Sequence, residues 1–158
     1  MADVWFRTIK EFGALPTKKD SVPTTAYVIS TELVPEEASE IALYAVIETG
    51  PNLRGRGYFE FRIYAGEKLQ LPFSAFLSFH GYPGNFWSSN STNFFLPMPH
   101  LGGRTIYVER KDTKGSKGLE GDNVNSGLWL MGYKAPEETA GKVRLLDEAP
   151  WETVEEED

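Results

Sequence analysis

Apolar and polar residues alternate along this chain in short segments, which is the pattern of β-strands. The segment 58–64 shows it most clearly, with apolar side chains on one face and charged ones on the other. We expect a strand here with one face in the core. The segments 25–31 and 41–49 are apolar at most positions on both faces. That pattern favours central strands that are covered on both sides.

Other segments show the same signals less strongly. Further strands are expected at 68–73, 76–79, 105–110 and 127–134, and weaker ones at 4–9 and 142–145. The segment 35–40 starts with Pro and early acids, which suits one short helical turn. The segments 81–91 and 111–126 are expected to be loops, and the second is polar and rich in Gly.

These elements predict an all-β fold. Fifteen Gly and ten Pro supply turns between about eight short strands, and no helix is long enough for a parallel crossover. We therefore expect an antiparallel two-sheet β-sandwich, jelly-roll-like, with at most one or two short helical turns. A single domain is expected over 1–146, followed by an acidic C-terminal tail or arm over 147–158.

The net charge of −7 belongs to that tail. Residues 147–158 hold seven of the 23 acidic residues and no Lys or Arg, which leaves 16 acids against 16 bases in residues 1–146. A neutral body does not attract phosphate backbones or anionic lipid. We therefore expect neither nucleic acid nor membrane as a partner. Neutrality also favours association between copies.

Cofactor and metal chemistry lack their usual residues in this sequence. There is no Cys, and His80 and His100 do not occur in a metal-binding spacing. The turn at 120–127 departs from a calcium-loop pattern. We expect no cofactor and no metal. The N-terminus lacks the pattern of a signal peptide, and no apolar run is long enough to cross a membrane, which favours the cytoplasm.

Catalytic motifs are also lacking, so we expect a protein that is not an enzyme. Glycoside hydrolysis needs only two suitably spaced carboxylates, and Glu60 or Glu109 could act as the acid or base. That hypothesis rests on residue type alone and ranks third, because solvated surface acids are common in β-proteins.

An aromatic and amide-rich segment, Tyr82–Phe95, is the most distinctive candidate site. Three interpretations stay open: a buried strand around Phe94 and Phe95, a subunit interface, or a lectin-like carbohydrate site with rings for stacking and amides for hydroxyl groups. The candidate partner- or glycan-binding residues here are Tyr82, Asn85, Phe86, Trp87 and Asn90.

Two further Trp residues lie near the ends of the chain. Trp5 lies in the first predicted strand and Trp151 in the acidic tail. A Trp in a terminal segment is suited to anchoring a neighbouring subunit or to packing on its own domain. Both are therefore candidate partner-binding residues.

Three phrases of the sequence resemble small β-sandwich virion proteins of tailed phages. They are Ala-Gly-Glu-Lys-Leu-Gln-Leu-Pro-Phe at 65–73, Arg-Thr-Ile-Tyr-Val-Glu-Arg at 104–110 and Ser-Gly-Leu-Trp-Leu-Met-Gly-Tyr at 126–133. The resemblance covers 58–134, and the Tyr82–Phe95 insertion departs from it. It implies a structural virion protein (capsid decoration, minor capsid, neck or tail) that binds protein subunits and has no catalytic residues.

Overall fold

The computed structural model describes residues 2–18, 24–50, 57–65, 75–81, 87–98, 104–112, 119 and 124–139. The described residues form eight strands. In chain order they are β1 (Ala2–Gly13), β2 (Thr24–Val28), β3 (Glu40–Thr49), β4 (Gly57–Ala65), β5 (Ala75–Gly81), β6 (Ser88–Pro97), β7 (Thr105–Asp112) and β8 (Val124–Ala135). Residues 137–139 add one helical turn.

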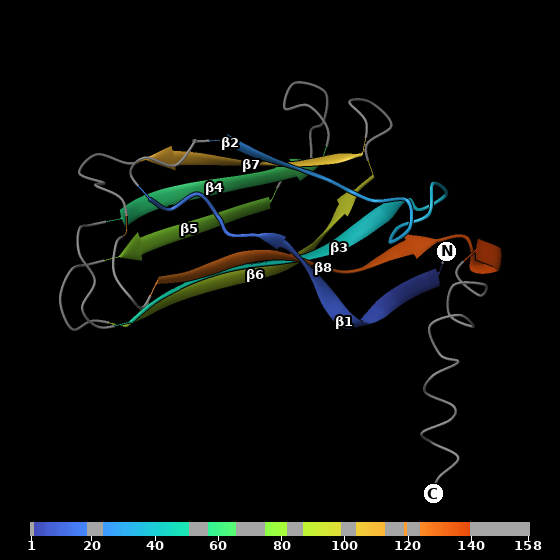
Figure 1. Ribbon diagram of the computed structural model, residues 1–158, viewed down its shortest axis with the longest axis horizontal. Coiled ribbons are helices and arrows are strands. Elements are labelled where there is room, and N and C mark those ends of the chain that lie inside the picture. The colour runs from blue at the N-terminus through green and yellow to red at the C-terminus, as the bar shows by residue number, and fades with distance from the viewer. Residues whose placement is uncertain are drawn as a thin grey trace, which may run out of the picture.

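The strands form two four-stranded antiparallel sheets (Figure 1). Sheet A has the order β1-β8-β3-β6 and sheet B the order β2-β7-β4-β5. Each of the first four described strands pairs with one of the last four, because β1 pairs with β8, β2 with β7, β3 with β6 and β4 with β5. This nested pairing is that of a long hairpin rolled into two sheets, which is a jelly roll. The predicted all-β sandwich is confirmed.

The core lies between the two sheets and is filled by alternate residues of the central strands. In β3, Ile41, Leu43 and Ile47 are fully buried, and in β4 Phe59 and Phe61 are equally enclosed. Because side chains of a strand alternate between its two faces, the same strands present their other residues outward. The expectation of one apolar face at 58–64 is confirmed, as is that of a central strand at 41–49.

Most other predicted strands also lie where the pattern placed them. β1, β5, β7 and β8 contain the segments predicted at 4–9, 76–79, 105–110 and 127–134. The predicted strands at 68–73 and 142–145 lie outside the described residues, as does the tail at 147–158. The segment 35–40 forms a single turn in which the Ala38 N–H donates to the Pro35 carbonyl over 3.1 Å, before β3 begins at Glu40.

The central position expected for 25–31 is wrong. β2 covers only Thr24–Val28, and among the described strands it lies at the edge of sheet B and pairs with β7 alone. Val28 is 76% exposed, while Ile29, beyond the strand, is buried. The Tyr27 hydroxyl donates to the Ala14 carbonyl over 2.9 Å. The apolar residues of this segment therefore cover the edge of the sandwich and the chain after β1, and they do not fill two faces of a central strand.

The sequence pattern indicates β6 only in part, since a buried strand around Phe94 and Phe95 is one of three interpretations of this segment, and Phe95 is in fact 38% exposed. The strand begins at Ser88, inside the segment expected to be a loop, and continues to Pro97. Its first six residues are Ser, Asn and Thr, which give no apolar alternation. β6 lies at the edge of sheet A and pairs along its whole length with β3. This segment therefore forms a strand because it pairs with a strongly apolar neighbour. Its own first residues do not indicate a strand.

Candidate functional site

The surface of sheet A that points away from the core carries aromatic side chains on all four strands. Since Ile41 and Leu43 of β3 point into the core, Ala42 and Tyr44 point outward, and the strand registers align outward residues of the other strands with them. We call this outer surface the aromatic face. Its aromatic residues are Trp5, Tyr44, Phe95 and Trp129.

Trp5 and Phe95 meet across the two strands that separate them. Trp5 of β1 is aligned with Gly132 of β8, and Gly132 with Ala42 of β3. Ala42 is aligned in turn with Phe95 of β6. The two large side chains extend over these small residues until their ring centroids are 5.8 Å apart. Trp5 remains 52% exposed and Phe95 38% exposed, so the aromatic pair is open to solvent.

Charged residues of both signs lie beside this pair. Lys134 lies two residues after Gly132 on β8 and is aligned with Asp3 of β1 and Glu40 of β3. Its Nζ is 3.3 Å from Glu40 Oε2. The same Nζ is 4.4 Å from the centroid of the Phe95 ring, within the range of a cation–π contact. A cation that is held by both a carboxylate and a ring presents an apolar stem and little net charge to an approaching surface.

The aromatic face continues toward the middle of the sheet. Tyr44 of β3 is aligned with Trp129 of β8, and their ring centroids are 5.8 Å apart. The Trp129 ring lies over Gly127, where an added Cβ would come within 2.2 Å of the ring. Glycine at this position thus leaves room for the indole ring, which adds a second aromatic pair to the outer surface.

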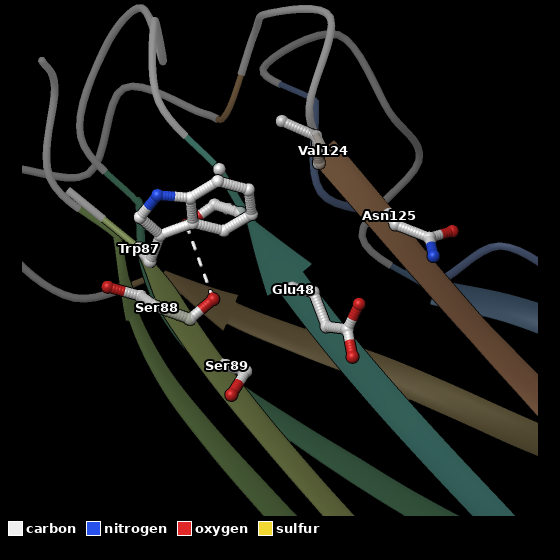
Figure 2. Close-up of a pocket in the computed structure, with 8 residues that line it drawn as sticks. Glu48, Trp87, Ser88, Ser89, Val124 and Asn125 are labelled. Carbon is white, nitrogen blue, oxygen red and sulfur yellow. Dashed lines mark hydrogen bonds between the residues drawn. The ribbon is translucent and has the colours of Figure 1, made fainter. Parts of the chain in front are cut away.

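A groove lies at the other end of the same sheet, where β3 ends and β6 and β8 begin (Figure 2). The open groove has a volume of about 630 Å³, and we call it the Trp87 groove. The described residues that line it are Glu48, Thr49, Gly50, Trp87, Ser88, Ser89, Val124 and Asn125. Trp87 is 77% exposed, the most exposed large apolar residue among those described.

The structure places three of the predicted site residues, each in a different setting. Trp5 belongs to the aromatic face and Trp87 to the groove. Asn90 is engaged within the chain, because its Nδ2 donates to the Ser78 carbonyl of β5 and its Oδ1 accepts from the Ser91 N–H at 2.9 Å. Asn90 thereby links the edges of the two sheets. The remaining candidates, Tyr82, Asn85, Phe86 and Trp151, lie outside the described residues.

Several residues of both surfaces were not singled out from the sequence. Tyr44 and Trp129 alternate with buried residues of β3 and β8, and this alternation is a signal that two faces of one strand differ in role. Glu48 and Asn125 gave no signal, since they become neighbours only through the pairing of β3 with β8.

The two acids of the hydrolase hypothesis lie on the outer face of sheet B. Glu60 Oε1 is 3.7 Å from Arg62 Nη2. Glu109 Oε2 accepts a hydrogen bond of 3.4 Å from the Tyr64 hydroxyl. Each carboxylate therefore has a partner within the sheet. Neither acid is among the described residues that line the Trp87 groove.

The Tyr64–Glu109 contact predicts a pH dependence of stability. Burial and, next, the charge of Glu109 raise the pKa of the Tyr64 hydroxyl above its ordinary value of 10.0. The unfolded chain then loses this proton at a lower pH than the folded chain, so stability falls as the pH rises above about 10. In Tyr64→Phe, urea unfolding between about pH 9 and 11 should show a smaller loss of stability than in the parent. An identical loss in both proteins would contradict the assignment.

No three His, Cys, Asp or Glu side chains gather into a metal-binding group within the ranges described. His80 of β5 packs against Tyr58, with ring centroids 5.2 Å apart, and His100 lies outside those ranges. None of the described residues forms a helix that is long and apolar enough to span a membrane.

No model of a known protein family matches this chain, and no curated protein matches it in sequence. The resemblance to phage virion proteins therefore stays a prediction.

Proposed function

We propose that this protein is a non-enzymatic structural subunit of a virion and that it assembles with protein subunits through the aromatic face. The observation that carries the proposal is the pair Trp5 and Phe95, which remain 52% and 38% exposed on an outer sheet surface. Exposed aromatic clusters are unusual on proteins that act alone, and aromatic residues are enriched at subunit interfaces.

A second copy of the chain is the partner that the aromatic face fits best. The Lys134–Glu40 ion pair at 3.3 Å places opposite charges side by side on this surface, and residues 1–146 are formally neutral. Two copies of a body without net charge meet without strong overall repulsion. A two-fold arrangement would bring the same aromatic residues together from both copies, as symmetric interfaces do.

The fold supports a structural role by analogy. Jelly rolls with eight strands form many viral capsid subunits, although lectins share the architecture, so the fold by itself does not select a function. The phrases at 65–73, 104–110 and 126–133 that resemble tailed-phage virion proteins point the same way. The virion setting rests on this analogy, and the contact surface rests on the exposed residues.

Sedimentation velocity over a range of protein concentrations tests the contact surface. The parent protein should self-associate, and Trp5→Ser should weaken association at least about tenfold, because aromatic anchors at interfaces contribute most of the binding free energy. Phe95→Ser should act in the same direction. Val28→Ser on sheet B is the matched control, since Val28 is even more exposed but lies on the other sheet.

Two outcomes bear on the proposal as a whole. A parent protein that is monomeric at every concentration and does not co-purify with any particle or shell protein would overturn it. If Val28→Ser and Trp5→Ser weaken association equally, the protein still assembles, but the aromatic face is not the surface through which it does so.

A further inference from the structure

The Trp87 groove lies at a distance from the Trp5–Phe95 pair of the aromatic face. Along β3, its residue Glu48 lies six positions after Ala42, which underlies that pair. At about 3.3 Å per residue, the groove and the pair are about 20 Å apart. Tyr44 of the aromatic face lies between them on β3. A ligand in the groove therefore need not compete with a subunit that contacts the pair.

The groove has an exposed aromatic wall. Trp87 immediately precedes β6, and Figure 2 shows its indole ring standing at one side of the groove, with Val124 and Asn125 of β8 at the other. An indole that is 77% exposed keeps most of its apolar surface in water, which is unfavourable. A flat ligand surface with C–H groups would cover it.

Three polar side chains form a row beside that ring. Glu48 of β3 is aligned with Ser89 of β6 on one side and with Asn125 of β8 on the other. The row therefore crosses two strand spacings, about 10 Å. All three residues are exposed. Within the described part of the chain, none of these three side chains forms a hydrogen bond or an ion pair. Their carboxylate, hydroxyl and amide groups are available to a ligand.

The frame of the groove is built on paired strands. Thr49, which is only 2% exposed, donates from Oγ1 to the Ser88 carbonyl over 3.5 Å. Thr49 is also aligned with Ser88 in β6 and with Val124 in β8. The strand end that carries Trp87 is thus tied to a buried residue of the central strand, so that the polar row and the backbone next to the ring keep fixed positions.

We propose that the Trp87 groove is a binding site for a neutral saccharide. A sugar ring would stack its C–H face on the Trp87 indole, while its hydroxyl groups would bond to Glu48, Ser89 and Asn125. The groove volume of about 630 Å³ lies within the usual range for small-molecule sites. No Lys or Arg is among the described residues that line the groove, and Glu48 repels anions, so phosphorylated and acidic ligands are disfavoured.

Titration of the full chain with single neutral oligosaccharides tests this site. The probes are hexasaccharides of glucose, galactose, mannose and N-acetylglucosamine, each followed by tryptophan fluorescence and by saturation-transfer NMR. At least one is expected to bind. Trp87→Ala should weaken that binding at least about tenfold, as removal of an aromatic anchor does. Asn125→Ala should weaken it less, and polygalacturonate should bind more weakly than the neutral probe.

Trp5→Ala is the matched control, because it removes an exposed Trp from the same sheet outside the groove. It should leave saccharide affinity unchanged within about twofold, while Trp87→Ala should leave self-association unchanged. Circular dichroism and thermal unfolding establish that each variant is folded. Absence of binding to every probe at millimolar concentration would overturn the proposal, as would equal affinity of the parent and a folded Trp87→Ala variant. Neither outcome alters the assembly proposal, which the Trp5 and Phe95 variants test separately.

Discussion

Replacing Gly132 by Ala is expected to destabilise the protein by about 3 kcal/mol, at the upper end of the cost of overpacking. A Cβ at this position would lie 2.1 Å from the Val4 carbonyl oxygen and 3.1 Å from the Trp5 Cα. Both are backbone atoms of β1, so no side-chain rotation relieves the clash, and β1 must move away from β8. Urea unfolding measures the loss, and amide hydrogen exchange should show reduced protection in β1.

Gly127→Ala provides the matched control on the same strand. Its Cβ would also clash, at 2.2 Å, but with the outer edge of the Trp129 ring. That ring is a side chain on the outer face and can rotate away, so a change in stability below about 1 kcal/mol is expected. If both variants lose the same free energy, approach of the β1 backbone is not the reason for glycine at position 132.

Arg110→Met is expected to cost about 3 kcal/mol. Arg110 is 7% exposed and lies on the core side of β7. Its Nη1 donates to the carbonyls of Pro16 (3.0 Å) and Lys18 (2.7 Å), and its Cζ is 5.5 Å from the centroid of the Phe59 ring. Methionine fills much of the same volume but leaves both carbonyls without their donor. Urea unfolding of the parent and the variant measures the difference.

The carboxylate that contacts Arg110 supplies the control. Arg110 Nε is 2.8 Å from Asp112 Oδ1, but the Asp112 side chain is 47% exposed and is solvated without the arginine. Asp112→Asn should therefore cost less than about 1 kcal/mol. A loss as large as that of Arg110→Met would show that the ion pair, and not the carbonyl contacts, makes this arginine important.

The strands that fill the core could be predicted because their own residues carry the pattern. β3 and β4 are apolar at the positions that point inward, and burial of those side chains is what holds the sandwich together. Arg110 also follows this alternation, because it is two positions after Val108 and four after Ile106, both buried. The alternation of β7 thus places the Arg110 side chain inward, although its charge suggests a surface position.

Features that depend on a neighbouring strand could not be predicted. β6 begins with polar residues and is a strand because β3 lies beside it. The apolar residues of β2 suggest a central strand, yet nothing in them shows that only one neighbour is present. The same limit applies to the candidate sites. Trp5 packs against Phe95, and Glu48 lies beside Asn125, only because of how the strands are aligned in the sheet. No local sequence pattern shows this alignment.

The nested pairing of the strands also sets an order for folding during synthesis. β4 and β5 are paired strands that follow one another in the chain, whereas β1 pairs with β8, which is synthesised last among the described strands. Pairs with large sequence separation form late, because closing the long loop between them costs entropy first. β1 would therefore remain unpaired until the residues up to 135 have been synthesised. During that time Trp5 is uncovered and the edge of β1 is open to other chains. The strand that contributes Trp5 to the proposed contact surface is thus also the one most exposed to premature association.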